Sequence, residues 1–523
     1  MEIVKNNIVS ILTGGVVVAV LVWGYIRSRP YGKLGLLSWL QSLALAAPWV
    51  TFFVSIALGI YPNGVFILAS IVASIVAYIL LGRSLRQLAR DEDERAKLEA
   101  RLAARSPDAS TSEAPGSPNE SKIPNANLRD GLSRATGMPT ARPQPDIGMS
   151  AEDLEAVRSI FGIDTFFATE TIPYQSGAIF RGNLRGEPEP TYQSLESKIA
   201  AATDNRYRAF LIPNRDGKPV VVVLPTADDP KPLNVSQKLL ALVLFAATIV
   251  TTAIASGLFL SFDLFAQPER WREVVPLAAG IWAIAGTHEI GHLVAARKHG
   301  VSLSWPFFLP AWQIGTFGSI VRFQSILPNR TALFDIAAAG PLASVAVSLG
   351  MMLLGFSLSN DASLFQIPTD FFRGSILVAS LAKLAIGDKL ASTLVSVHPL
   401  VLLGWLGLVI NALNLLPAGQ LDGGRIMQAI YGRRVAGVAT ILSLLFLGLA
   451  TLVNPLALYW AILILVAQRD LERPSANELA EPDDARAIVA LLGFLLVILT
   501  LIPLTPSLAA RWGIGSAAIV FGG

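Results

Sequence analysis

Long apolar runs constrain this chain more than any other feature of its sequence. About nine stretches of roughly 20 mostly apolar residues recur along it, which is the length that a helix needs to cross a bilayer. Charged residues make up only 15% of the 523 residues, whereas a soluble globular chain carries about 25%. These features exclude an ordinary soluble enzyme and a disordered chain, and they predict a polytopic α-helical membrane protein in a lipid bilayer.

The apolar runs form two blocks with a polar region between them. Three candidate spans lie in the first block and six in the second, and the run at 435–467 is long enough for two short helices because Asn454-Pro455 interrupts it. The total is therefore about nine spans, give or take one. The candidate spans are residues 8–26, 39–60, 65–81, 239–260, 275–296, 332–356, 400–416, 435–467 and 487–508.

Composition divides the chain into four parts. Residues 1–82 form an N-terminal membrane anchor of three spans, and residues 83–149 form a charged helix and a linker rich in Pro and Ser that cannot bury enough apolar surface to fold. Residues 150–228 predict a small soluble α/β domain, inserted before the transmembrane domain at 236–523. No catalytic constellation occurs in 150–228, so we interpret that part as a recognition or gating module.

Basic residues beside the spans predict the orientation of the chain. Lys and Arg next to a span mark its cytoplasmic end, and alternating the spans brings all of these clusters to one side. This places the α/β domain in the cytoplasm and the end of the span at 275–296 near the cytoplasmic face. No Arg- and Ser-rich leader precedes residue 8, which favours a bacterial plasma or thylakoid membrane over an imported organelle protein. The clusters lie at 27–33, 83–90, 297–298, 433–434 and 469–473.

Composition also limits the partners and the ligands of a metal. The net charge of +3 is too balanced to indicate a nucleic-acid partner, and nothing in the sequence indicates an oligomeric state. The chain has no cysteine and only four histidines. A zinc site in this chain would therefore need His and carboxylate ligands.

The segment His288-Glu289-Ile290-Gly291-His292 is an H-E-x-x-H motif inside an apolar helix. Residues four apart share one face of a helix, so both imidazoles can bind one metal ion. Glu289 lies one step further around the helix, where it can act as general base toward water. A chance match or a buried polar helix face is the alternative, but ionisable groups inside a span are costly and usually functional. The motif therefore predicts a zinc site.

The third ligand is expected from a second motif. A catalytic zinc needs three protein ligands and an open position, and neither His299 nor His398 is well placed in the predicted topology. Asp422 closes an apolar span that runs in the same direction as the one carrying His292. Before it, Pro417 removes a backbone donor.

Glycines near Asp422 fit an interrupted helix. Gly419, Gly423 and Gly424 are expected to release the helix geometry. Unwound backbone at membrane depth is tolerated where it lines a watery cavity. An ordinary helix C-cap would explain the Gly pair, but it would leave the acid and the preceding Pro unexplained.

Substrate contacts are expected from two further places. Asn414 can stabilise an oxyanion or anchor substrate backbone, although capping the broken helix explains this residue equally well. Residues 315–324, which include Gly315, Phe317, Gly318 and Ile320, predict a strand. Its edge can hold an unwound substrate by strand addition, and the alternative is a hairpin that serves only packing.

Together, the two motifs resemble the site-2 protease family of intramembrane zinc metalloproteases. In that family the two His and the Asp bind zinc and the Glu activates water, and the resemblance gives these roles to His288, His292, Asp422 and Glu289. The segment 315–318 (Gly-Thr-Phe-Gly) is similar to a G-x-F-G stretch of the plant EGY proteases and their cyanobacterial relatives. The resemblance implies a zinc endopeptidase that acts on transmembrane protein substrates in regulated intramembrane proteolysis.

A second interpretation is a metal transporter or a non-catalytic membrane scaffold that retains a zinc site. Broken helices and polar groups at the midplane also mark transporters. A transporter would be expected to contain internal repeats, and the two membrane blocks do not match one another. It also leaves the position of Glu289 unexplained.

Overall fold

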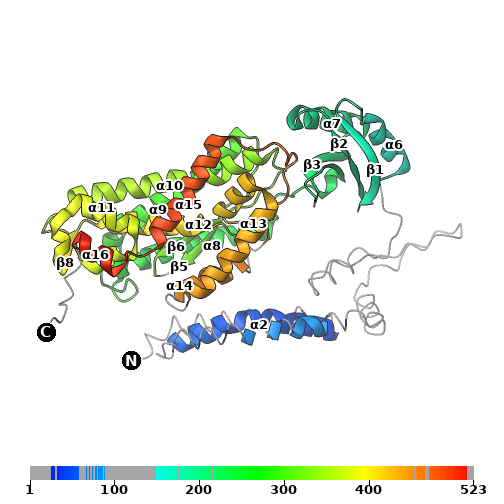
Figure 1. Cartoon of the computed structure of the whole chain (residues 1–523). Helices are drawn as coiled ribbons and strands as arrows, with labels where there is room; N and C mark the ends of the chain where they lie inside the picture. Colours follow the sequence, from blue (N-terminus) through cyan, green and yellow to red (C-terminus); the bar gives the residue numbers. More distant parts are fainter. Residues whose placement is uncertain are drawn as a thin grey trace. The chain divides into compact units, whose positions relative to one another are not determined.

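The computed structural model describes residues 149–514, except for 175, 215, 312, 452–454 and 466–469, and part of residues 25–88. The expected first span at 8–26, the charged helix and the linker fall almost wholly outside these residues. The chain divides into two compact units, of which one comprises residues 1–145 and 448–458 and contains helix α2 (Gly32–Ala57). The other comprises 146–447 and 459–523. All further features lie in this second unit, apart from the ends of α13 and α14 (Figure 1).

A four-stranded antiparallel sheet with two helices forms the first part of this unit. The strand order is β1-β2-β4-β3, and α6 and α7 cover one face through Val157, Leu195 and Ile199. Because side chains alternate across a strand, Phe180 and Leu211 enter this core and their neighbours lie on the other face. The elements are α6 (Ala151–Ile160), β1 (Phe166–Tyr174), β2 (Gly177–Leu184), α7 (Pro188–Ala202), β3 (Tyr207–Pro213) and β4 (Pro219–Pro225).

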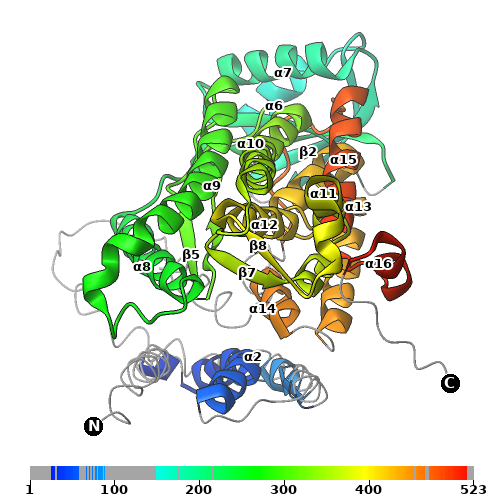
Figure 2. The ribbon, with the colours of Figure 1, turned by 90° about the vertical axis from the view of Figure 1, so that its left-hand side faces the viewer.

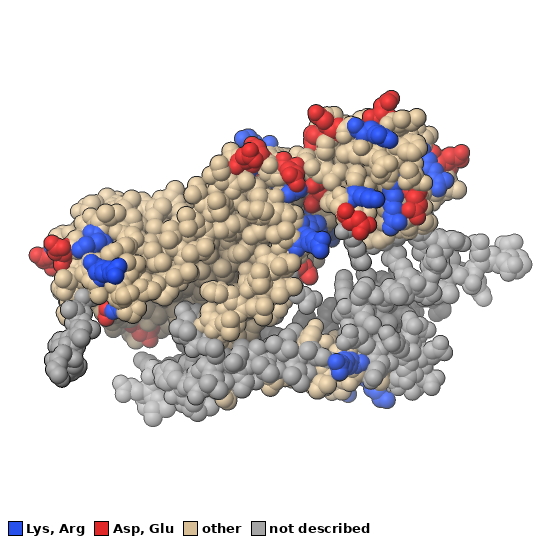
Figure 3. All heavy atoms as spheres, viewed as in Figure 1, with Lys and Arg blue, Asp and Glu red and all other residues tan. Residues whose placement is uncertain are grey.

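The rest of the unit is mostly helical, as expected of a polytopic membrane protein. Among the described residues, five helices are long and apolar enough to cross a membrane, and α12 is apolar but shorter. The face of this bundle seen in Figure 3 carries almost no charge between its ends. The helices are α8 (Val235–Phe259), α9 (Trp271–Lys298, preceded by the short turn Pro268–Arg270), α10 (Arg330–Leu358), α12 (Pro399–Asn414), α13 (Asp422–Ala450), α14 (Pro455–Leu463) and α15 (Asp484–Leu501).

The helix after α12 differs from the expectation. A span was predicted at 435–467, but α13 begins at Asp422, and Gly432 (φ 80°) interrupts it. Its first part contains Arg425 and Gln428, which lowered the apolar signal in the sequence. Both side chains are buried by other parts of the protein, so this stretch is helical without facing lipid.

Short elements complete the bundle. β5 and β6 form an antiparallel hairpin that packs on α8, and β6 ends at Ile320, earlier than the predicted strand end at residue 324. Helix α10 packs against both α9 and α12 (Figure 2). The elements are β5 (Phe307–Ala311), β6 (Gly315–Ile320), β7 (Phe365–Pro368), α11 (Ile376–Ile386), β8 (Leu394–Val397) and α16 (Pro506–Trp512).

The segment at residues 476–478 connects the sheet to the helical bundle through hydrogen bonds. Leu211 at the edge of the sheet donates its N–H to the Ala476 carbonyl at 2.8 Å and accepts the Glu478 N–H at 2.9 Å. On its other side, Ala476 donates to the Leu327 carbonyl at 2.8 Å. Asn477 Nδ2 also donates to Glu189 Oε2 at 2.8 Å. These bonds fix the sheet beside the connection between β6 and α10.

Candidate metal centre

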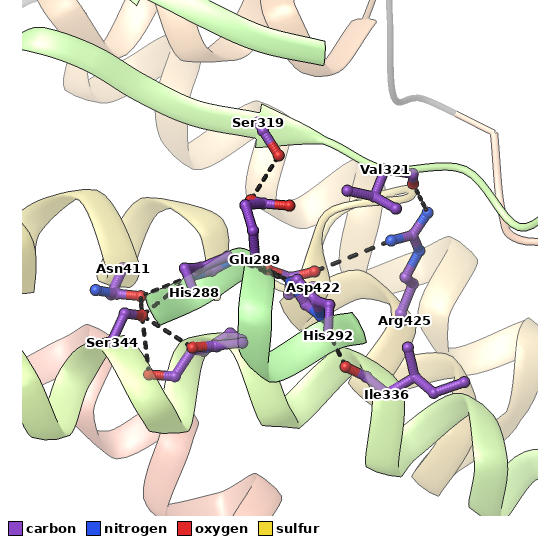
Figure 4. A network of polar contacts seen from close by, with 12 residues as sticks. His288, Glu289, His292, Ser319, Val321, Ile336, Ser344, Asn411, Asp422 and Arg425 are labelled. Carbon is purple, nitrogen blue, oxygen red and sulfur yellow. Dashed lines mark hydrogen bonds and ion pairs between the residues drawn. The ribbon is translucent and has the colours of Figure 1, made fainter. Parts of the chain in front are cut away.

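Three side chains that can bind a metal ion converge inside the helical bundle (Figure 4). His288 and His292 lie one turn apart on α9, and Asp422 is the first residue of α13. The two Nε2 atoms are 3.0 Å apart, and Asp422 Oδ2 lies 3.1 Å from His288 Nε2 and 3.5 Å from His292 Nε2. All three residues are buried. The structure thus brings together the three ligands that the sequence predicted from two separate motifs.

These distances fit a single zinc ion. Zinc binds His nitrogen at about 2.0–2.1 Å and carboxylate oxygen at about 2.0–2.2 Å, so two ligands at the tetrahedral angle lie about 3.3 Å apart. The three distances of 3.0, 3.1 and 3.5 Å lie around that value. Two His and one carboxylate are also a donor set of catalytic zinc sites, which keep the fourth position open.

Hydrogen bonds at the other ring nitrogens orient both imidazoles. His292 Nδ1 donates to the Ile336 carbonyl on α10 at 2.8 Å, so its Nε2 is left with the lone pair that a metal needs. His288 Nδ1 lies 3.0 Å from Ser344 Oγ and 3.2 Å from Asn411 Oδ1. Ser344 also donates to Asn411 Oδ1 at 2.5 Å. Sequence reasoning missed Ser344 and Asn411, and the only signal was that both are polar residues within apolar helices.

Glycines allow the backbones around the centre to approach one another. A Cβ atom on Gly340 of α10 would lie 2.3 Å from His292 Nε2, and one on Gly291 would lie 2.5 Å from the Ala339 carbonyl oxygen. Real Cβ atoms do not make contacts this short. Only glycine therefore lets α9 and α10 pack closely enough for His292 to reach the centre.

The role expected for the Gly pair after Asp422 is wrong. Gly423 and Gly424 do not release the helix, because they lie in the first turn of α13. A Cβ on Gly423 would lie 1.9 Å from the Leu415 carbonyl oxygen, so the pair lets this turn pack against the end of α12. Gly419 does interrupt the chain, with a φ of +50° in the left-handed region that favours glycine.

Glu289 faces the β6 strand. Ser319 Oγ donates to Glu289 Oε1 at 2.6 Å, and Figure 4 shows the glutamate rising from α9 toward this strand. The carboxylate is therefore held between the metal ligands and the strand that was predicted to bind substrate. Among the described residues, nothing besides Ser319 forms a hydrogen bond with this carboxylate.

Asn414, the last residue of α12, also lies against β6. A Cβ built on Gly318 would lie 2.9 Å from Asn414 Nδ2, so the amide sits directly against β6. Asn414 is buried, and its side chain makes no hydrogen bond to any residue that the structure describes. It therefore does not cap the helix, and its donor groups remain available.

Two small pockets flank the centre. An apolar one lies beside His288 and Glu289, is lined by Gly318, and has a volume of about 20 Å³. A polar one of about 20 Å³ lies beside His292 and Asp422 and is lined by Ser319 and Ile320 of β6. Asn414 lines both pockets.

Not all of the predicted substrate-binding residues reach these pockets. Gly318 and Ile320 line them, whereas Gly315 and Phe317 do not. The Gly315 carbonyl accepts a hydrogen bond from Thr251 on α8 at 2.6 Å. The Phe317 ring packs edge-on against Trp460 at 5.7 Å. Both residues thus anchor the hairpin.

Family models match both parts of this unit. Residues 276–453, which contain the metal centre, match Peptidase family M50, and residues 155–232, which contain the sheet, match the EGY3 middle domain. The Arabidopsis thaliana protein "Probable zinc metalloprotease EGY1, chloroplastic" is 34% identical over 393 residues, which cover 68% of this chain and 72% of that protein. The chain belongs to the EGY branch of peptidase family M50. This confirms the resemblance to the site-2 protease family.

Another relative of this M50 family member comes from rice. "Probable zinc metalloprotease EGY2, chloroplastic" of Oryza sativa subsp. indica is 40% identical over 332 residues, which cover 62% of this chain. The match covers 61% of that protein, so the chain spans about three fifths of its length. No solved structure matches the chain.

One arginine of the M50 domain connects the candidate metal centre to the residue that follows β6. Arg425, one turn after Asp422, has its Nη1 atom 4.0 Å from Asp422 Oδ1. Its Nη2 atom donates to the Val321 carbonyl at 2.8 Å and lies 3.0 Å from Glu472 Oε2. This residue was not predicted, although its i,i+3 spacing from a candidate ligand was a usable signal.

The other two histidines lie outside the centre. His299 Nε2 is 2.9 Å from Asp335 Oδ2, and Arg486 binds the same carboxylate. His398 caps the N-terminus of α12, where its Nδ1 accepts the Leu400 N–H at 3.3 Å. Each of these two histidines therefore forms a hydrogen bond away from the candidate metal centre.

Proposed function

We propose that this chain is an intramembrane zinc endopeptidase that hydrolyses peptide bonds in or near transmembrane segments of membrane-protein substrates. The observation that carries the proposal is the convergence of His288, His292 and Asp422 beside Glu289. Membership of the M50 family supports it, and the matched relatives are named as zinc metalloproteases. A zinc ion, when bound, lowers the pKa of water and polarises a carbonyl group.

Glu289 is the general base in this proposal. Its Oε1 atom accepts the Ser319 hydrogen bond at 2.6 Å, which holds the carboxylate beside β6 and leaves Oε2 to take a proton from the attacking water. The same carboxyl group then returns the proton to the leaving amine. Asn414 donates its unused amide N–H to the oxygen on which negative charge develops.

The β6 strand binds the substrate. A transmembrane helix keeps its peptide bonds in its own hydrogen bonds, so it must unwind before hydrolysis. The edge of β6 between Gly318 and Ile320 holds the unwound segment by strand addition.

The finer topology belongs to the same proposal. About nine spans, with an N-terminal anchor at 1–82 and a linker at 83–149, carry a cytoplasmic α/β domain at 150–228 before the protease domain at 236–523. Arg297 and Lys298 follow the metal-binding helix and favour a cytoplasmic position for that end. The membrane is a bacterial plasma or thylakoid membrane, such as that of a cyanobacterium.

Glu289→Gln in the purified full-length chain tests the proposal. A protease variant of this kind keeps about one zinc ion per chain and loses cleavage of a tagged single-span substrate that the wild type cuts. Asp422→Asn should lose both zinc and cleavage. A wild type that transports zinc in vesicles and cuts no membrane substrate would contradict the proposal and favour a transporter. Cleavage that survives in Glu289→Gln would remove the role of Glu289.

A further inference from the structure

A cavity of about 750 Å³ lies between the sheet and the helical bundle that contains the candidate metal centre. Ligand-binding cavities usually measure about 300–1,000 Å³, so this one is large enough for several residues of a peptide. One wall is the sheet face that α6 and α7 leave uncovered. The opposite wall is the connection from β6 to α10, together with residues 472–474. The sheet wall includes the apolar residues Ile179, Phe210, Ile212, Val222 and Leu224.

The cavity lies next to the polar pocket at the candidate metal centre. The polar pocket beside His292 and Asp422 shares three lining residues with it, namely Ile320, Gln420 and Arg425. Ile320 is the last residue of β6. A polypeptide that pairs with the edge of β6 would therefore reach the cavity just beyond the end of this strand.

The charges in the cavity favour an acidic occupant. Among the residues that the structure describes, no ion pair involves Lys231, Arg322 or Arg473, all of which line the cavity. The acids there are mostly neutralised, since Asp229 pairs with Arg208 at 3.1 Å and Glu472 pairs with Arg425 at 3.0 Å. Asp228 is then the one acid in the described lining that pairs with no cation. The described lining thus contains three basic side chains without an ion pair and one such carboxylate.

We propose that this cavity docks, in extended conformation, the substrate segment on the water side of the bond to be cut. The inference rests on the proposed protease function. The segment carries apolar side chains for the sheet face and a net negative charge for Lys231, Arg322 and Arg473. The α/β domain thereby selects substrates by the sequence of the tail that leaves the membrane.

Photo-crosslinking tests the occupant directly. The chain has no cysteine, so Phe210→Cys carries one benzophenone maleimide at a single position. Ile163→Cys is the matched control, because Ile163 is 73% exposed in the same domain and does not line the cavity. Both are made in Glu289→Gln and mixed with a single-span peptide that bears an acidic, Leu-containing tail of roughly ten residues, about 33 Å when extended.

The expected result is an adduct between the label at position 210 and the tail of the peptide, with none at position 163. An adduct to this chain's own residues 101–145, an adduct to a second copy, or no adduct would overturn the inference. Cleavage by the wild type without an adduct would leave the protease function standing and remove the docking site. An adduct without cleavage would support docking and remove the protease function, and failure of both would remove both.

A charge reversal gives a second readout in the full-length chain that keeps Glu289. Arg473→Glu should lower kcat/KM for an acidic tail relative to a basic tail by about two- to fivefold, the range for one exposed ion pair. Lys198→Glu is the control, because Lys198 lies on α7, which covers the opposite face of the sheet. An equal ratio in the two variants would contradict charge selection by the cavity.

Discussion

Gly340→Ala should detach one of the three proposed metal ligands. A Cβ at position 340 would lie 2.3 Å from His292 Nε2, 2.6 Å from its Cε1 and 2.7 Å from its Cδ2. A relaxed contact needs about 3.5 Å, so the ring must retreat by roughly 1.2 Å. Zinc–ligand distances hold within about 0.2 Å, and His292 cannot keep its place in the site after such a shift.

The His292 ring has little freedom to move away from such a Cβ atom. His292 Nδ1 is fixed by the Ile336 carbonyl at 2.8 Å, and the residue is 5% exposed. We therefore expect zinc affinity to fall by at least about 100-fold, the upper end of the loss caused by removing a hydrogen-bond partner of a metal ligand. Cleavage should fall with it.

Zinc competition against a chelator of known affinity measures the effect on purified protein. Gly350→Ala is the matched control, because it lies on the same helix and a Cβ there meets nothing within 4 Å. Both substitutions favour the helix by a similar amount. Equal zinc affinity in the two variants would refute the packing argument for His292.

Four further substitutions separate metal binding from substrate binding. Asn411→Leu removes a partner of His288 Nδ1 and should lower zinc affinity about 10- to 100-fold; affinity equal to wild type would show that Asn411 does not orient His288. Asn414→Ala should keep zinc and lower kcat by about 10²- to 10³-fold in a cleavage assay, and an unchanged kcat would exclude it from oxyanion binding. Gly318→Pro or Ile320→Pro should abolish cleavage while metal analysis still finds zinc, and undiminished turnover would exclude strand addition to β6.

The ligand set could be predicted from the sequence because helix periodicity is strict. His288 and His292 must share a face at i,i+4 spacing. The chain has no cysteine and its other two histidines are poorly placed in the predicted topology, so a carboxylate was the expected third ligand. The start of α13 at Asp422 was not predictable in this way. Its first turns are polar and buried by protein, and only tertiary packing makes such a stretch helical.

The groups that support the ligands required three-dimensional information. Ser344 and Arg425 act through contacts with residues that are 56 and 104 positions distant in the chain. Glycine is required at position 340 because the His292 ring lies directly against it. No local sequence pattern predicts that contact. The cavity beside the sheet depends on how segment 475–479 docks on the edge of β3. The sequence composition does not predict that contact.

Zinc content and proteolysis measured on one purified preparation test whether His288, His292 and Asp422 hold a catalytic zinc ion. We expect about one zinc ion per wild-type chain, with X-ray absorption showing two His nitrogens and oxygen at about 2.0–2.2 Å and no sulfur. Asp422→Asn should lose the ion and the cleavage together. A full complement of zinc in Asp422→Asn, or a zinc-loaded wild type whose absorption spectrum shows fewer than two imidazoles, would contradict the claim.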